Sequence, residues 1–197
     1  LYGDNTEIDI NAIPLNHASF SRLQFDEILG IDSSLFTEKE ENDIRAKVFT
    51  TWGNSLDKDE FVKVHESYFF DSRNEPVFPS SVSKGVIYIV RNPLDVAVSF
   101  SNHKQMDLDK AIEQMADVDF NFVKKRGNDH NQQLSQPMST WSNHVTSWLD
   151  QTHIPVHLIR YEDMMKDAYN TFSNALAFLD INADVDMIKS AMYKSSF

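Results

Sequence analysis

Residues 85–100, with the sequence GVIYIVRNPLDVAVSF, decide the fold. Within them, residues 86–90 form a short apolar run that is typical of a buried parallel strand. Asn92 and Pro93 follow as the N-cap and first residue of a helix, which we expect to continue to about Asn102. A buried strand that leads directly into a helix indicates an open α/β sheet, where ligands bind at the carboxyl ends of the strands.

The segments on both sides of this stretch continue the alternation of strands and helices. Further strands are expected at Phe61–His65 and Val156–Tyr161. Further helices are expected near residues 20–29, from the Thr37–Glu40 capping box to Gly53, over 108–115 and 141–149, from Glu162 through Leu179, and over 185–193. Residues 73–84 and 124–136 have the composition of exposed loops. This pattern predicts one domain over residues 1–197, a mainly parallel sheet with helices on both faces.

The composition narrows the classes of function. A chain of 197 residues with 41% apolar residues can bury the core of a single globular domain. A net charge of −12 argues against a general nucleic-acid partner, because phosphate backbones require clustered Lys and Arg. The absence of Cys excludes disulfides and thiolate metal sites, and no Asp, Glu and His cluster suggests a catalytic metal. With no apolar run near 18 residues and no signal-peptide pattern, we expect a cytoplasmic protein that does not bind membranes.

Arg91 is the strongest candidate for a ligand-binding residue. It follows the 86–90 strand directly and precedes the N-terminus of a helix, and both features favour an anion. Its guanidinium presents a planar fork of donors that suits phosphate. Ser99 lies on the same helix, on one face with Asp95, and its hydroxyl could donate to a phosphate oxygen. The alternative is that Arg91 pairs with Asp95 and that Ser99 has only a packing role.

Residues 88–99 resemble the 3′-phosphate-binding motif of the sulfotransferases that use 3′-phosphoadenosine 5′-phosphosulfate (PAPS). The resemblance implies that Arg91 and Ser99, eight residues apart, hold the 3′-phosphate of the nucleotide. It also implies the fold of that family, a P-loop-NTPase-like, three-layer α/β/α domain with a central, mainly parallel sheet. The residues of this motif are most similar to those of the bacterial branch of the family, which resembles the cytosolic sulfotransferases.

Four further segments resemble motifs of the same family, in the family's order. They are Lys63-Val64-His65, Trp141 to Trp148, Arg160 to Met164, and Ser195-Ser196-Phe197. The resemblance implies that His65 is the general base and that Tyr161, Ser195 and Phe197 contribute to the adenine pocket. A His that titrates near neutrality suits removal of a proton from an acceptor. Lys63 alternates with His65, so its cation could stabilise charge on the transferring group, or it could be an ordinary solvated Lys.

Two segments of the family pattern have no match here. They are the early phosphosulfate-binding loop of the Lys-Ser-Gly-Thr-Thr-Trp kind and the late Arg-Lys-Gly segment. We expect that the chain represents the ordered part of a longer enzyme; a genuinely truncated and inactive protein is the alternative.

The sequence therefore predicts a PAPS-dependent sulfotransferase, with PAPS as co-substrate and a small-molecule acceptor that it does not identify. Two other functions stay open. One is a nucleotide-dependent kinase of similar fold, and the other is a non-catalytic module that binds adenosine bisphosphate.

Overall fold

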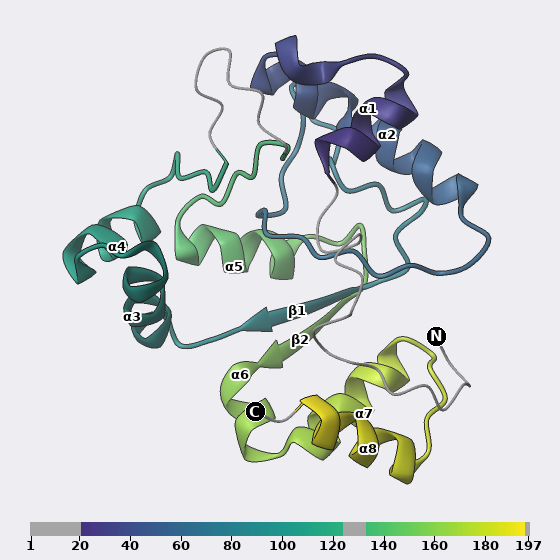
Figure 1. The fold of residues 1–197 in the computed structure, drawn as a ribbon, viewed down its shortest axis with the longest axis vertical. Helices are drawn as coiled ribbons and strands as arrows, with labels where there is room; N and C mark the ends of the chain where they lie inside the picture. Colours follow the sequence, from purple (N-terminus) through teal and green to yellow (C-terminus); the bar gives the residue numbers. More distant parts are fainter. Residues whose placement is uncertain (1–20, 124–132, 196–197) are drawn as a thin grey trace.

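The computed structural model describes residues 21–123 and 133–195, and from β1 onward its strands and helices follow the order that the sequence predicts (Figure 1). The helices are α1 (Arg22–Leu29), α2 (Glu38–Ser55), α3 (Pro93–Lys104), α4 (Leu108–Met115), α5 (Trp141–Asp150), α6 (Tyr161–Lys166), α7 (Ala168–Phe178) and α8 (Val185–Ser195), with a 3₁₀ turn at Ser33–Leu35. The strands are β1 (Val86–Val90) and β2 (Val156–Arg160). Capping explains several starts: Ser21 and Thr37 form capping boxes, and Asn92 caps α3 with Pro93 as its first residue.

The two strands pair in parallel and in register, from Val86 opposite Val156 to Val90 opposite Arg160. In the described part of the chain the sheet consists of this pair. Each strand is followed at once by a helix, α3 after β1 and α6 after β2. The register therefore brings the residues that follow the strands, Arg91 and Tyr161, to the same edge of the sheet.

Helices cover both faces of the sheet, so the domain has the predicted three layers (Figure 1). On one face, Val86 and Tyr88 of β1 pack against the core around Trp148 of α5. On the other face, the His157 ring of β2 stacks on Phe178 of α7, with centroids 5.3 Å apart. Gly85 allows this close packing, because a Cβ atom there would lie 2.9 Å from a ring carbon of Phe178.

The predicted strand at Phe61–His65 is wrong. These residues form neither helix nor strand, and the side chains of Phe61 and Val64 are 53% and 39% exposed. The apolar pattern suggested burial, but no neighbouring strand in the described residues pairs with the segment. Side chains of α5 instead form hydrogen bonds with the backbone at its C-terminal end.

Two smaller expectations are also wrong. Helix α2 passes through Gly53 to Ser55, and Gly53 contacts Val82, whose Cβ atom would be 2.7 Å from an added Cβ. This glycine therefore permits a close approach to the 73–84 loop and does not end the helix. In the predicted exposed loop 124–136, the described residues Leu134, Ser135 and Gln136 are buried.

None of the helices in the described ranges is long and apolar enough to cross a membrane.

Candidate functional site

Arg91 and Tyr161 form the centre of an edge that we call the Arg91 edge (Arg91, Asn92, Tyr161 and Glu162). The Arg91 guanidinium carbon lies 4.7 Å from the centroid of the Tyr161 ring, within cation–π distance. The Arg91 Nε atom is buried and has no hydrogen-bond partner among the described residues. The side chain as a whole is nevertheless 39% exposed, so an acceptor from outside the protein can reach the guanidinium.

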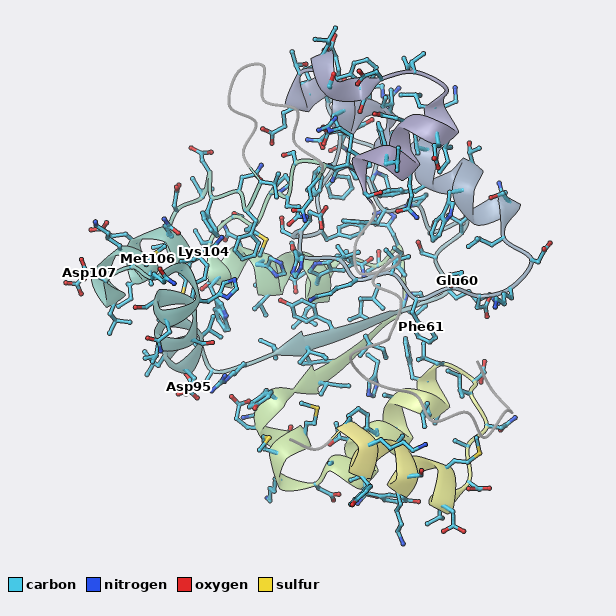
Figure 2. All side chains as sticks on the ribbon, in the orientation of Figure 1. Glu60, Phe61, Asp95, Lys104, Met106 and Asp107 are labelled. Carbon is cyan, nitrogen blue, oxygen red and sulfur yellow. The ribbon has the colours of Figure 1, made fainter. Side chains whose placement is uncertain are left out.

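Asp95 does not form a hydrogen bond with Arg91 Nε, although the sequence left open that these two side chains pair. Its Oδ2 atom lies 4.0 Å from Arg91 Nε, beyond hydrogen-bond distance. The two side chains are 54% and 39% exposed, and exposed pairs of this kind contribute about 0–1 kcal/mol. In Figure 2, Asp95 lies at the end of α3 that is next to the carboxyl end of β1. The pair leaves the guanidinium available to an anion.

Asn92 joins the two strand-to-helix turns. Its backbone N–H donates to Glu162 Oε1 over 2.8 Å, and its side-chain Oδ1 accepts from the Leu94 N–H over 3.0 Å. The bond from Asn92 is the main reason that the pKa of the Glu162 carboxyl is lowered. Because β1 with α3 and β2 with α6 are tied together here, Arg91 and Tyr161 have fixed relative positions.

Ser99 lies on the exposed side of α3, on one helical face with Asp95. At a rise of about 1.5 Å per residue, it lies about 9 Å along the helix axis from Pro93. No hydrogen bond to its hydroxyl is formed by the part of the chain that the structure describes. The hydroxyl is therefore available to a ligand that extends from Arg91 along α3.

His65 lies in a segment that we call the His65 segment (residues 63–68). Its backbone N–H donates to Glu66 Oε2 over 3.0 Å, and its carbonyl oxygen lies 2.9 Å from His144 Nε2. Burial, followed by the charge of Lys63, lowers the pKa of the His65 imidazole, while Glu66 acts in the opposite direction. The imidazole is accordingly neutral near pH 7 and can accept a proton. Lys63 is exposed.

An aromatic cluster of Phe100, Phe120 and Phe122 lies between His65 and α3. The Phe122 ring contacts the His65 ring edge-on, with centroids 5.9 Å apart, and it also contacts Phe100 of α3 at 5.9 Å. Phe100 directly follows Ser99, so the candidate base and the candidate anion-binding helix lie on two sides of one cluster. The Lys104 ammonium, at the last residue of α3, lies 5.2 Å from the Phe122 centroid. The sequence analysis missed this cluster, although the alternation of Phe120 and Phe122 could have indicated it.

A buried ionic network anchors the other end of the His65 segment. Glu66 Oε1 accepts from Arg45 Nη1 over 3.2 Å, and Arg45 Nη2 also donates to Glu41 Oε1 over 2.8 Å. Glu41 Oε2 pairs with Arg22 over 2.9 Å, so one carboxylate is shared by two guanidiniums. The network connects α1 and α2 to the residue next to His65.

The remaining predicted site residues are not brought to this edge by any contact in the described residues. Ser195 is exposed at the end of α8, and its hydroxyl donates to the Ala191 carbonyl over 2.9 Å. Phe197 lies outside the described residues. The roles of Ser195 and Phe197 in an adenine pocket stay predictions. Within the described ranges, no group of three or more His, Asp or Glu side chains could hold a metal ion.

Comparisons with known proteins identify the family and the fold of this chain. The model of the sulfotransferase domain family matches residues 74–197, a segment that contains the Arg91 edge and Ser99 but begins after His65. Sulfotransferase 2A6 of Mus musculus is 34% identical over 122 residues, which are 61% of this chain and 39% of the relative. The crystal structure of mouse sulfotransferase SULT7A1 complexed with PAP matches with a TM-score of 0.54 and 22% identity, over 76% of this chain and 50% of that chain.

The structural match confirms the predicted P-loop-NTPase-like α/β fold. The chain spans half or less of the length of each of these two relatives.

Proposed function

This chain belongs to the sulfotransferase domain family, and from that membership we propose that it transfers a sulfuryl group from PAPS to a hydroxyl or amine of a small-molecule acceptor. The observation that carries the proposal is the Arg91 guanidinium at the carboxyl edge of the sheet, which is 39% exposed and lies 4.0 Å from the nearest carboxylate oxygen given for it, that of Asp95. The mouse structure that shares the fold is a complex with PAP, the product that PAPS leaves after transfer. This supports an adenosine bisphosphate as the ligand of the edge.

In the proposed complex, Arg91 donates to the 3′-phosphate of the nucleotide and Ser99 donates from α3. A planar guanidinium makes paired, charge-assisted hydrogen bonds to phosphate, and the ring of Tyr161 holds it in place. Tyr161, with Ser195 and Phe197, is proposed to contact the adenine. The Glu162 carboxylate is already occupied by the Asn92 N–H, so it orders the edge without occupying the fork of Arg91.

His65 supplies the base in this proposal. Its imidazole takes the proton of the acceptor hydroxyl or amine, the acceptor oxygen or nitrogen forms a bond to sulfur, and the bond from sulfur to the phosphate oxygen of PAPS breaks. The electron pair of that bond leaves with the adenosine bisphosphate. Lys63 stabilises negative charge on the transferring and departing groups. The aromatic cluster beside His65 supports a base that is partly shielded from water.

The cytoplasmic location, the bacterial branch and the absence of nucleic-acid and membrane partners stay predictions from the sequence.

A binding and transfer experiment on the full chain tests the proposed function. We expect adenosine 3′,5′-bisphosphate to bind more tightly than ATP in isothermal titration calorimetry, and we expect labelled sulfate to pass from PAPS to a component of an acceptor mixture. A preference for ATP would instead support a kinase of similar fold. Tight binding of the bisphosphate without transfer to any acceptor would support a non-catalytic binding module.

A further inference from the structure

Three side chains of α5 hold the His65 segment. His144 Nε2 lies 2.9 Å from the His65 carbonyl oxygen, and the Trp148 indole N–H donates to the Glu66 carbonyl over 2.9 Å. The Ser147 hydroxyl accepts from the Tyr68 N–H over 3.0 Å. Residues 144, 147 and 148 are spaced i, i+3 and i+4, so they lie on one face of the helix. This face supplies the backbone partners that a neighbouring strand would supply in a sheet.

His144 is the member of this face whose ring also lies within hydrogen-bond distance of a side chain of the sheet. Its Nδ1 atom lies 2.9 Å from the hydroxyl of Tyr88, in the middle of β1. Phe61, at the start of the preceding irregular segment, lies near the amino end of β1 (Figure 2). The His144 ring therefore ties the His65 backbone to the middle of β1.

The hydrogen bonds determine the tautomer of His144. A carbonyl oxygen only accepts, so Nε2 must carry the hydrogen that His65 receives. Nδ1 then presents its lone pair and accepts from the Tyr88 hydroxyl. Burial lowers the pKa of the His144 imidazole and raises the pKa of Tyr88 to about 12, so both groups are neutral, as this arrangement requires.

We propose that His144, oriented by Tyr88, is a positioning residue that places His65 for proton removal from the acceptor. This inference rests on the proposed function, because it assigns His65 as the base. His144 does not touch the reacting atoms. It acts through the His65 carbonyl. One hydrogen bond joins this carbonyl to the His144 ring, and a second joins the ring to Tyr88 of β1. A misplaced catalytic group of this kind costs roughly 100-fold in rate.

Kinetics of two His144 variants of the full chain give the first test. His144→Phe removes the donor to the His65 carbonyl, and we expect kcat for sulfuryl transfer to fall roughly 10- to 100-fold while KM for PAPS and the stoichiometry of bisphosphate binding stay near wild type. His144→Gln restores an amide N–H at a similar distance from the backbone, so it should recover a large part of kcat. His157→Phe is the matched control, because His157 lies on the opposite face of the sheet. Wild-type kcat in His144→Phe, or equal losses in the Phe and Gln variants, would overturn the proposal.

Nuclear magnetic resonance gives a second test that does not depend on activity. In ¹⁵N-histidine-labelled protein at neutral pH, His144 should be neutral and protonated at Nε2. The amide signals of residues 65–68 should shift in His144→Phe and stay in place in His157→Phe. A charged His144, or the Nδ1–H tautomer, would refute the arrangement. If the wild-type chain transfers no sulfate, the proposed function fails, and these spectra still decide whether His144 positions the segment.

Discussion

The Arg91 edge and the His65 segment are built in different ways. At the Arg91 edge, strand register and helix capping position the side chains, and Arg91 to Ser99 lie within one short stretch of sequence. The His65 segment has no partner strand in the described residues. It depends on bonds such as that from Trp148 to the Glu66 carbonyl, across 82 residues of sequence.

The difference shows which half of a site a short motif can specify. A strand, a turn and a capped helix determine their own geometry, so the residue types from Val86 to Ser99 are enough to predict the layout of the part of the Arg91 edge that they contain, while Tyr161 and Glu162 follow the second strand. A segment held by distant side chains takes its geometry from elements that the motif does not contain. The two halves should accordingly fail in different ways when they are changed.

Removal of the base should give the largest effect and separate the two halves most clearly. In His65→Ala we expect kcat to fall about 10²- to 10⁴-fold, the usual contribution of a general base, with bisphosphate affinity unchanged. The base acts when neutral, so wild-type kcat/KM should rise as the pH increases through the pKa of His65 and level off above it. Burial lowers that pKa, so the rise should lie on the acidic side of the usual histidine range. Full activity of His65→Ala would show that the His65 segment does not supply the base.

Removal of the guanidinium tests the Arg91 edge alone. Arg91→Ala should weaken bisphosphate binding roughly 10- to 100-fold, since a hydrogen bond to a charged group contributes about 1.5–3 kcal/mol. Arg91→Lys should recover only part of the affinity, because an ammonium lacks the planar fork. Arg160→Ala is the matched control. Arg160 is the last residue of β2, directly before Tyr161, and its side chain is 61% exposed. Equal losses for Arg91 and Arg160, measured by calorimetry, would mean that general positive charge binds the ligand.

A single bond of the α5 face should give the smallest effect. Trp148→Phe keeps most of the buried ring and removes the indole N–H that donates to the Glu66 carbonyl. We expect a loss of about 1 kcal/mol in the free energy of unfolding by urea, because one buried hydrogen bond is broken. Transfer should slow while bisphosphate affinity is retained. Trp141→Phe, at the first residue of the same helix, should change neither quantity; a similar loss there would point to a general effect on α5.

The sequence predicted β1, the capped α3 and the position of α4 closely, because strand length, capping residues and helical spacing are local signals. Its interpretation of Arg91 as a phosphate-binding residue stays a prediction. The strand at 61–65 failed because an apolar run does not reveal whether a partner strand lies beside it. Gly53 was misassigned for a related reason, since only the folded structure brings Val82 against it.

The supporting residues of the site were the harder part to predict. His144 and Trp148 stand in a segment that resembles a family motif, yet their partners at His65 and Glu66 are about 80 residues away in sequence. The contact between Phe122 and His65 likewise crosses more than 50 residues. Periodicity indicates which face of a helix is apolar, but it does not identify the backbone atoms that a polar side chain on that face will meet.

Gly85 sets the thickness of the domain between the sheet and α7. A methyl group at this position would lie 2.9 Å from a ring carbon of Phe178, so that ring would have to turn and its stacking on His157 would change. Phe178 is the last residue of α7, which follows α6 almost without interruption, and α6 begins with Tyr161, whose ring lies beside the Arg91 guanidinium. Anyone who redesigns this protein for new ligands should therefore keep Gly85, because it permits the packing of the helix pair that begins at the binding edge.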